Sequence, residues 1–295
     1  MVGASAPSVP LNAMRIGFVG AGKVGFSLGK FFAEGGLPIA GYYSRSVESA
    51  HEAAAFTGSS CFESLAELVA ASDAIFITVP DGAISGVYQN LRAYDLTGKQ
   101  LCHCSGSLAA AEVFPGLEEV GATGYSLHPL FPVSSKTDSY RELPGAFFCI
   151  EGDEAHLAEW KQRIEALGPQ VQVISGAAKK RYHAACAISS NLVCALVQQS
   201  LDMLVACGFS EESALRAITP LVRANMEHII EHGPAGALTG PIERNDATTV
   251  ASHLQCFDTA MERELYRFAS LKLVEVAQKK HSESDYTNMR ETLNA

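Results

Sequence analysis

The 295-residue sequence has few basic residues. Lys and Arg together number 22 against 32 Asp and Glu, which gives a net charge of −10. Proteins that bind nucleic acid independently of its sequence rely on a basic surface, so this balance argues against a nucleic-acid partner. It does not exclude a phosphorylated cofactor held by a few local cations. Hydrophobic residues at 47% and charged residues at 18% are typical of a folded globular chain.

Long hydrophobic runs and cysteine motifs are also absent. No uninterrupted run of about 18 apolar residues occurs, so we expect no membrane-spanning helix. Residues 1–13 carry neither a basic region nor an apolar segment, so we expect a loose tail and not a signal peptide. The cysteines form no C-x-x-C pair and have no zinc-ligand spacing. We therefore expect small buried thiols in a cytoplasmic protein, and no metal site.

The first half of the chain alternates short apolar segments with helical ones. The predicted strands are 15–20, 38–44, 74–80, 99–106, 123–129, 146–152 and 171–175. Helical segments separate them, among them 23–34, 63–71 and 154–167. This alternation predicts an α/β, doubly wound, Rossmann-like domain with a parallel sheet over residues 14–176.

The second half has no convincing strand, so we predict an all-α domain over 177–295. Gly208 should end a helix over 179–207, and Pro220 should kink the next one. A further helix is predicted over 247–280. Its apolar residues exceed what one domain needs, which favours a homodimer through this domain. The alternative is that they form an internal core.

A glycine-rich turn is the strongest motif. Gly20, Gly22 and Gly25 have G-x-G-x-x-G spacing, after a predicted strand and at the start of a predicted helix. Such a turn lets the backbone approach a pyrophosphate, which the amides of the helix N-terminus then bind. The alternative is an ordinary glycine-rich turn. The predicted pyrophosphate site comprises Gly20, Ala21, Gly22, Lys23, Val24 and Gly25.

The residues after the second strand distinguish between dinucleotides. An NAD site has a carboxylate there to bind the ribose 2′-hydroxyl, whereas this chain has Ser44, Arg45 and Ser46. A charge-assisted contact between Arg45 and a 2′-phosphate should contribute ~1.5–3 kcal/mol. NADP(H) is therefore the predicted cofactor, unless Arg45 is simply a solvated loop residue.

Polar residues follow the later strands. Val79 and Pro80 follow one strand, Ser105 and Ser107 another, and His128 ends a third. Ligands of doubly wound sheets bind beyond the carboxyl ends of the strands, so we predict cofactor contacts for Val79, Pro80 and Ser105. Ser105, Ser107 and His128 are candidates for substrate binding. His128 precedes a proline, so a structural turn is the alternative for it.

The segment 179–191 carries the catalytic candidates. Lys179 and His183 are four residues apart and share a helical face, with Asn191 about 80° further round. Reducing a ketone leaves charge on oxygen, which a positioned acid must stabilise or protonate. We predict Lys179 as the general acid or oxyanion stabiliser, His183 as its neighbour or the acid itself, and Asn191 as an orienting group. The alternative is a solvated first turn with His183 packed against the sheet.

Arg244 is the last candidate, for binding the carboxylate of a small-molecule substrate. It follows a turn fixed by Gly240 and Pro241, and arginine is suited to bidentate carboxylate binding. A salt bridge with Glu243 or Asp246 is the alternative. Asp246 itself should cap the helix that follows.

Several stretches resemble one bacterial family. They are "GFVGAGKVG", "HCSGSL", "SLHPL", "KKRYHAACAISSN" and "TGPIERND". The family joins a Rossmann-like domain to a small helical domain of long-unassigned function, and most members are labelled NADP-type oxidoreductases. One branch resembles an alternative class of ketopantoate reductases, which make pantoate for coenzyme A. The layout is more distantly similar to pyrroline-5-carboxylate reductases and β-hydroxyacid dehydrogenases.

The resemblance implies an NADPH-dependent reductase of a small 2-oxo acid, with 2-dehydropantoate (ketopantoate) as the best single guess and pantothenate biosynthesis as its setting. The alternatives are an imine reductase of the pyrroline-5-carboxylate type and a non-catalytic NADPH-binding module. A deazaflavin cofactor also stays open, because relatives with similar N-terminal domains use one. The sequence departs from the family at Lys180, where proline is usual, and at Asn245, where glycine is usual.

Overall fold

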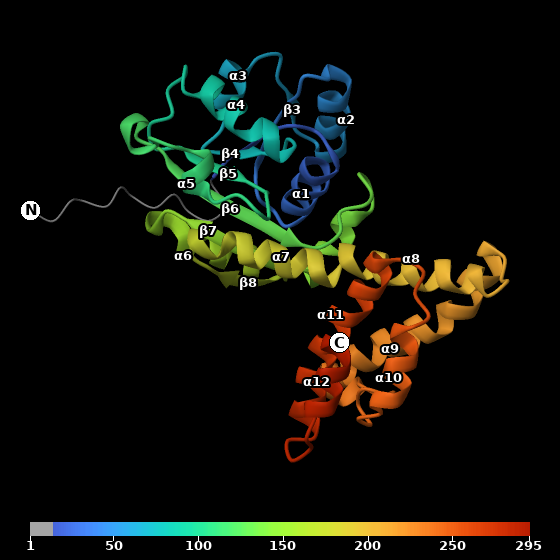
Figure 1. The fold of residues 1–295 in the computed structure, drawn as a ribbon. Coiled ribbons are helices and arrows are strands. Elements are labelled where there is room, and N and C mark those ends of the chain that lie inside the picture. The colour runs from blue at the N-terminus through green and yellow to red at the C-terminus, as the bar shows by residue number, and fades with distance from the viewer. Residues whose placement is uncertain (1–13) are drawn as a thin grey trace, which may run out of the picture. The chain divides into compact units, whose positions relative to one another are not determined.

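The computed structural model describes residues 14–295, so the loose tail predicted for 1–13 lies outside the described residues. The chain divides by its contacts into two compact units, the first ending at Ser189 and the second spanning Ser190–Ala295 (Figure 1). We expected a boundary near residue 176. The division falls later because helix α7 (Lys179–Ser189) belongs to the first unit, where its first side chain is buried.

The first unit contains an eight-stranded sheet with the order β3-β2-β1-β4-β5-β6-β7-β8. The strands are β1 (Ile16–Val19), β2 (Ile39–Tyr43), β3 (Ser60–Cys61), β4 (Ala74–Ile77), β5 (Gln100–His103), β6 (Thr123–Leu130), β7 (Phe147–Gly152) and β8 (Gln170–Val173). The predicted doubly wound, Rossmann-like fold is confirmed, and the seven predicted strands are present, together with the unpredicted β3. Because β1 lies between β2 and β4, the strand order reverses at the end of β1, where such sheets bind dinucleotides.

One pair of strands departs from the predicted parallel sheet. β7 runs antiparallel to β6, whereas β8 is parallel to β7. A parallel neighbour needs a long crossover, usually an α-helix. The connection between β6 and β7 has only the short 3₁₀ turns Ser139–Arg141 and Leu143–Gly145, so the chain returns antiparallel.

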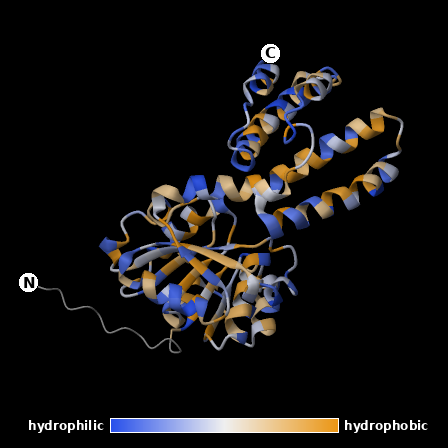
Figure 2. Ribbon diagram, turned by 90° about the horizontal axis from the view of Figure 1, so that it is seen from below, coloured by the Kyte–Doolittle hydropathy of each residue, from blue (hydrophilic) through white to orange (hydrophobic). Residues whose placement is uncertain are grey.

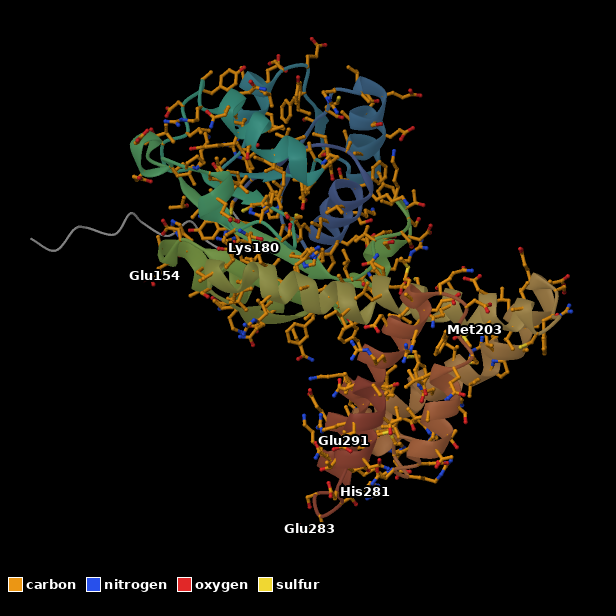
Figure 3. All side chains as sticks on the ribbon, in the orientation of Figure 1. Glu154, Lys180, Met203, His281, Glu283 and Glu291 are labelled. Atoms are coloured by element: carbon orange, nitrogen blue, oxygen red, sulfur yellow. The ribbon has the colours of Figure 1, made fainter. Side chains whose placement is uncertain are left out.

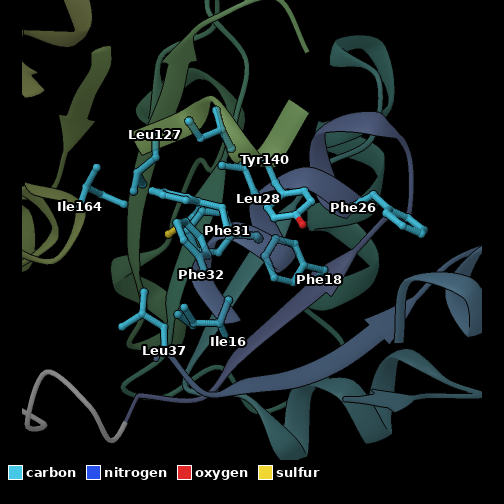
Figure 4. Close-up of a cluster of buried hydrophobic side chains, with 14 of the residues drawn as sticks. Ile16, Phe18, Phe26, Leu28, Phe31, Phe32, Leu37, Leu127, Tyr140 and Ile164 are labelled. Carbon is cyan, nitrogen blue, oxygen red and sulfur yellow. The ribbon is translucent and has the colours of Figure 1, made fainter. Parts of the chain in front are cut away.

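Helices cover both faces of the sheet. They are α1 (Lys23–Glu34), α2 (Val47–Thr57), α3 (Leu65–Ala71), α4 (Asp81–Leu91), α5 (Ala110–Val113), α6 (Glu154–Glu165) and α7. Side chains of α1, α2 and α6 form one core around Phe18 of the sheet (Figure 4). The Phe18 ring stacks on that of Tyr42, with 5.0 Å between ring centroids. Side chains of α3, α4 and α5 form the other. Burial on both faces makes the sheet a rigid support for the loops at its edge.

The second unit is helical, as predicted. Its helices are α8 (Asn191–Ala206), α9 (Glu211–Ala237), α10 (Ala247–Leu254), α11 (Ala260–Lys280) and α12 (Thr287–Asn294). The two long helices expected from the sequence are each interrupted. Ser190 leaves helical geometry (φ −123°, ψ −76°) between α7 and α8. Thr259 and Glu262 form a capping box that starts α11 anew.

The run Gly176–Ala206 is long and apolar enough, by length and composition, to cross a membrane. This is weak evidence for a span, because helices of soluble proteins pass the same test. The break at Ser190 and the burial of Lys179 within the first unit both oppose one continuous span. Figure 2 shows many hydrophobic residues along α8 and α9, and α8 has no buried residue.

Candidate active site

The three glycines of the turn between β1 and α1 differ in how much space surrounds them. Gly20 has φ +109°, and a Cβ there would lie 3.0 Å from the Thr78 backbone. A Cβ on Gly25 would lie 2.4 Å from Thr78 Oγ1. By contrast, a Cβ on Gly22 would meet nothing within 4 Å. The chain's own packing therefore requires Gly20 and Gly25 but not Gly22, whose open space fits the pyrophosphate of a dinucleotide.

The segment after β2 lies at the same edge of the sheet. Arg45 is exposed between Ser44 and Ser46. Ser46 caps α2, because its Oγ accepts a hydrogen bond from the backbone N–H of Ser49 at 3.2 Å. An exposed cation and the N-terminus of α2 thus lie side by side, which is an arrangement suited to an anion.

Ser105 and Ser107, whose hydroxyl groups are predicted to contact ligands, both lie within hydrogen-bond distance of the Asp81 carboxylate. Ser105 Oγ and Ser107 Oγ donate to Asp81 Oδ2 at 2.7 and 3.2 Å. Asp81 opens α4, directly after Val79 and Pro80. The structure thus brings the ends of β4 and β5 together, and it commits both hydroxyls to Asp81.

Lys179 is buried at the first turn of α7, and its role as general acid or oxyanion stabiliser stays a prediction. Only 1% of its surface is exposed. Its Nζ donates to the Ser105 carbonyl at 2.8 Å and to Ser126 Oγ at 2.7 Å. Burial lowers the pKa of the Lys179 ammonium, while the carboxylate of Glu151 acts in the opposite direction. Lys179 therefore ties the first turn of α7 to the ends of β5 and β6.

The imidazole rings of His128 and His183 both lie close to Gly106. A Cβ on Gly106 would lie 2.5 Å from His183 Nδ1 and 2.8 Å from His128 Nε2, so only glycine leaves room for both rings. His183 is exposed and His128 is half-buried, with their ring centroids 6.2 Å apart. On its other side, His128 Nδ1 lies 2.7 Å from Tyr182 Oη.

The sequence interpretation missed Gly106 and Tyr182. Both stand inside the quoted tracts "HCSGSL" and "KKRYHAACAISSN". A glycine between two serines at a strand end was the available signal for a close approach of side chains. Nothing in the sequence marked Tyr182, because its role depends on the distant His128.

Asn191 and Arg244 belong to the second unit. Asn191 is the first residue of α8, beyond the break at Ser190, and does not continue the helix of Lys179. Asp246 caps α10, as predicted, with its Oδ1 accepting from the Thr249 N–H at 3.0 Å. The predicted roles of Asn191 and Arg244 in orienting and binding the substrate stay predictions. Within residues 14–295, no group of three or more His, Cys, Asp or Glu side chains could hold a metal ion.

The buried imidazole of His103, in β5, makes the stability of the folded protein depend on pH. It is fully buried, its Nδ1 accepts from the Ser105 N–H at 3.2 Å, and Nε2 has no partner among the described residues. Burial lowers the pKa of His103 from 6.5 to about 3. The unfolded chain therefore takes up this proton first as the pH falls. The resulting stability is fully present above about pH 6.5 and is lost towards pH 3.

We expect His103→Asn to flatten the acid dependence of folding. Between pH 7 and 5, the wild type should lose about 2 kcal/mol of unfolding free energy through this residue, at ~1.4 kcal/mol for each pH unit below 6.5. The variant should lack that part of the loss. Urea unfolding followed by circular dichroism at both pH values measures the difference. Equal losses in the two proteins would contradict the assignment.

Two family models match successive parts of the chain, and the second begins within the first compact unit. A model of a Rossmann-like domain matches residues 4–129, and a model of a domain of unknown function, DUF2520, matches residues 146–273. No curated protein sequence matches the chain.

Solved structures match over most of the chain. A putative NADP oxidoreductase, BF3122 from Bacteroides fragilis, is 23% identical with a TM-score of 0.67, covering 90% of this chain and 99% of its own. Pyrroline carboxylate reductase from Plasmodium falciparum, solved with NADP bound, is 18% identical with a TM-score of 0.57, covering 92% and 98%. These similarities establish the fold.

Protein TM1727 from Thermotoga maritima is more similar in sequence. It is 30% identical with a TM-score of 0.73, and the match covers 90% of this chain and 99% of that one. Because identity at this level extends over nearly all of both chains, the protein belongs to the same family as TM1727, a family that joins a Rossmann-like domain to the DUF2520 domain.

Proposed function

We propose that the protein is an NADP(H)-dependent reductase of a small 2-oxo acid, with 2-dehydropantoate to pantoate as the best single reaction. The observation that carries this proposal is the meeting of His128 and His183 above Gly106, at the same edge of the sheet as the glycine turn. Fold neighbours that are named for NADP chemistry support the cofactor.

The residues that would hold NADP(H) lie at the carboxyl ends of the strands. The 20–25 turn and the N-terminus of α1 would bind the pyrophosphate, and Arg45 with Ser44 and Ser46 would bind the 2′-phosphate. Val79, Pro80 and Ser105 follow β4 and β5, where the nicotinamide half belongs in this fold.

When bound, NADPH supplies the hydride for the substrate carbonyl carbon. His128 would donate a hydrogen bond from Nε2 to the carbonyl oxygen, which polarises the bond. His183 would deliver the proton that the resulting alkoxide takes up, and its exposed ring can exchange protons with solvent. Lys179 holds the Ser105 carbonyl and α7 in place.

The proposal is tested with purified protein, NADPH and a panel of 2-oxo acids and cyclic imines, followed at the nicotinamide absorbance. We expect turnover of a branched 2-oxo acid, with 2-dehydropantoate preferred, and its loss in His128→Gln and His183→Gln. Absence of turnover with every carbonyl and imine, despite NADPH binding, would favour the non-catalytic module instead.

An imine reductase is the second candidate. The fold neighbour from Plasmodium falciparum is named as a pyrroline carboxylate reductase, which makes this class relevant. Preference for pyrroline-5-carboxylate over every 2-oxo acid in the same panel would select it. A deazaflavin is tested separately, as a competitor in the NADPH-binding assay.

Replacing Arg45 should reveal which dinucleotide is used. We expect Arg45→Ser to weaken NADPH binding about 10- to 150-fold and to leave NADH binding unchanged, because only NADPH carries the 2′-phosphate. Fluorescence titration at fixed ionic strength measures both affinities. Arg92→Ser is the matched control, since Arg92 is a surface cation paired with Glu119 at 2.8 Å. Equal weakening of both cofactors in Arg45→Ser would contradict the assignment.

We further propose a homodimer through the helical domain. Leu221, Ile230 and Met261 expose 70%, 81% and 82% of their surface. Between α8, α10 and α11 lies a largely apolar cavity of about 510 Å³. Met203, labelled in Figure 3, is one of the residues that line it. A second subunit packed on this unit would cover such exposed apolar side chains.

Light scattering after size exclusion should therefore give twice the 31.3 kDa chain mass. Ile230→Lys combined with Met261→Lys should shift the protein towards the monomer, because burying two lysines opposes association. Tyr94→Ser, at an exposed aromatic residue of the first unit, is the control and should leave the mass unchanged. A wild-type protein of 31.3 kDa would contradict the proposal.

A further inference from the structure

The Tyr182 hydroxyl group has no part in the mechanism proposed above, yet it contacts the imidazole ring of His128, which is central to that mechanism. Tyr182 lies three residues after Lys179 on α7 and is half-buried. Its Oη is 2.7 Å from His128 Nδ1, and the thiols of Cys149 and Cys186 are also hydrogen-bond neighbours. We infer that Tyr182 is a positioning residue that fixes His128 in the tautomer with its proton on Nε2.

The direction of this hydrogen bond follows from the chemistry of the two groups. Burial lowers the pKa of His128 from 6.5 to about 4, with the charges of Lys179 and His183 acting in the same direction, so the ring is neutral at pH 7. A neutral imidazole carries one N–H and one bare nitrogen. A phenol is the more acidic donor and the imidazole nitrogen the more basic acceptor, so Tyr182 Oη–H donates to Nδ1.

The surroundings of Tyr182 support the same direction. Thiol groups are weak donors as well as weak acceptors. The hydrogen bonds with Cys149 and Cys186 favour the protonated phenol, and a thiol is a weaker acceptor than an imidazole nitrogen, so the phenol hydrogen goes to His128 in preference to the sulfur atoms. Burial also raises the pKa of Tyr182, so the phenol keeps its hydrogen.

With Nδ1 occupied, the single N–H of His128 is on Nε2. This nitrogen lies beside the space that Gly106 leaves open, next to His183 Nδ1. The hydrogen bond that one ring nitrogen makes determines which nitrogen bears the proton. Tyr182 therefore determines that His128 presents an N–H donor, and not a bare nitrogen, at the site.

This tautomer narrows the substrate class, an inference that rests on the proposed function. A neutral N–H donor matches a carbonyl oxygen, which has lone pairs to accept it. A protonated iminium has no lone pair on nitrogen and gains nothing from the same donor. The geometry therefore favours reduction of C=O over reduction of a protonated C=N.

Nitrogen NMR of the full-length protein tests the tautomer directly. With ¹⁵N-labelled histidine, the His128 signals are assigned by their loss in His128→Gln. We expect the wild type to show a protonated Nε2 and a bare Nδ1 at pH 7. A wild-type His128 with its proton on Nδ1 would overturn the inference, whether or not the protein turns over any substrate.

The variant Tyr182→Phe then tests whether the Tyr182 hydroxyl group fixes this tautomer of His128. We expect a mixture of both tautomers in this variant and a fall in kcat of about 10- to 100-fold, with the NADPH affinity unchanged. Tyr94→Phe, at an exposed tyrosine outside the site, should match the wild type in all three respects. A pure Nε2–H tautomer in folded Tyr182→Phe would overturn the positioning role.

Gly106→Ala provides a second variant. The new methyl group would overlap both imidazole nitrogens, at 2.5 and 2.8 Å, so the signals of His128 and His183 should both shift. Unshifted signals would overturn the placement of Nε2. Because the NMR readouts are independent of turnover, a protein that reduces no 2-oxo acid but shows the Nε2–H tautomer would refute the proposed function alone.

Discussion

Gly22→Ala is expected to weaken NADP(H) binding about 10- to 100-fold while leaving the folded protein as stable as the wild type. The backbone of Gly22 has φ −78° and ψ −175°, which any residue adopts, and a Cβ there meets nothing within 4 Å. The space beside it would be occupied by the cofactor. A methyl group forced against a pyrophosphate should cost ~1–3 kcal/mol of binding free energy.

Gly25→Ala is the matched comparison. Its Cβ would lie 2.4 Å from Thr78 Oγ1 and 2.5 Å from the Gly20 carbonyl oxygen, so the chain itself must move. We expect ~1–3 kcal/mol of lost unfolding free energy in this variant. Thermal unfolding and NADPH titration of both variants separate the two effects. If Gly22→Ala bound NADPH normally, the dinucleotide assignment of this turn would be wrong.

Lys179→Met is expected to reduce turnover about 100-fold without weakening NADPH binding. Methionine keeps most of the apolar stem but removes the Nζ that donates to the Ser105 carbonyl and Ser126 Oγ. Hydrogen bonds from a charged group typically contribute ~1.5–3 kcal/mol, so we also expect a stability loss of that order. Freed from β5 and β6, the first turn of α7 should no longer hold Tyr182 and His183 against His128.

Lys180→Met is the control for this variant. Lys180 is the next residue along α7, and its Nζ pairs with Glu112 Oε1 at 2.8 Å on the exposed surface (Figure 3). Exposed ion pairs contribute little to stability, so turnover and unfolding should match the wild type. Circular dichroism, stopped-flow reduction and NADPH titration compare the two variants. Turnover in Lys179→Met equal to that in Lys180→Met would remove the anchoring role from Lys179.

The parts of the fold that depend on local sequence were predictable. Apolar strand segments alternating with helices predicted the doubly wound sheet, and the spacing of Gly20, Gly22 and Gly25 predicted a turn between strand and helix. Asn245, which stands where the family usually has glycine, has φ 58°, a left-handed conformation that asparagine tolerates better than most residues. Each of these signals lies within a few consecutive residues.

Helix breaks were harder to predict. The capping box of Thr259 and Glu262 was readable as a T-x-x-E pattern, but the apolar periodicity continued through it and hid the break. Ser190 carries no comparable signal, and its non-helical backbone separates α7 from α8 at the boundary of the two units. Periodicity reports which face is apolar, and it does not report where one helix ends and the next begins.

The burial of Lys179 could not be predicted. Three consecutive cations at a helix start predict a solvated turn, and Lys180 does lie exposed in an ion pair. Lys179 differs because two acceptors, one after β5 and one in β6, lie far from it in sequence, and only the folded sheet brings them within reach. The same holds for Tyr182 and His128, which are 54 residues apart.

The division after Ser189 has an evolutionary consequence. The glycine turn, Arg45 and both imidazoles precede this residue, whereas Arg244 follows it. Recombination at this joint would exchange the helical unit while leaving the glycine turn, Arg45 and both imidazoles together in one inherited unit.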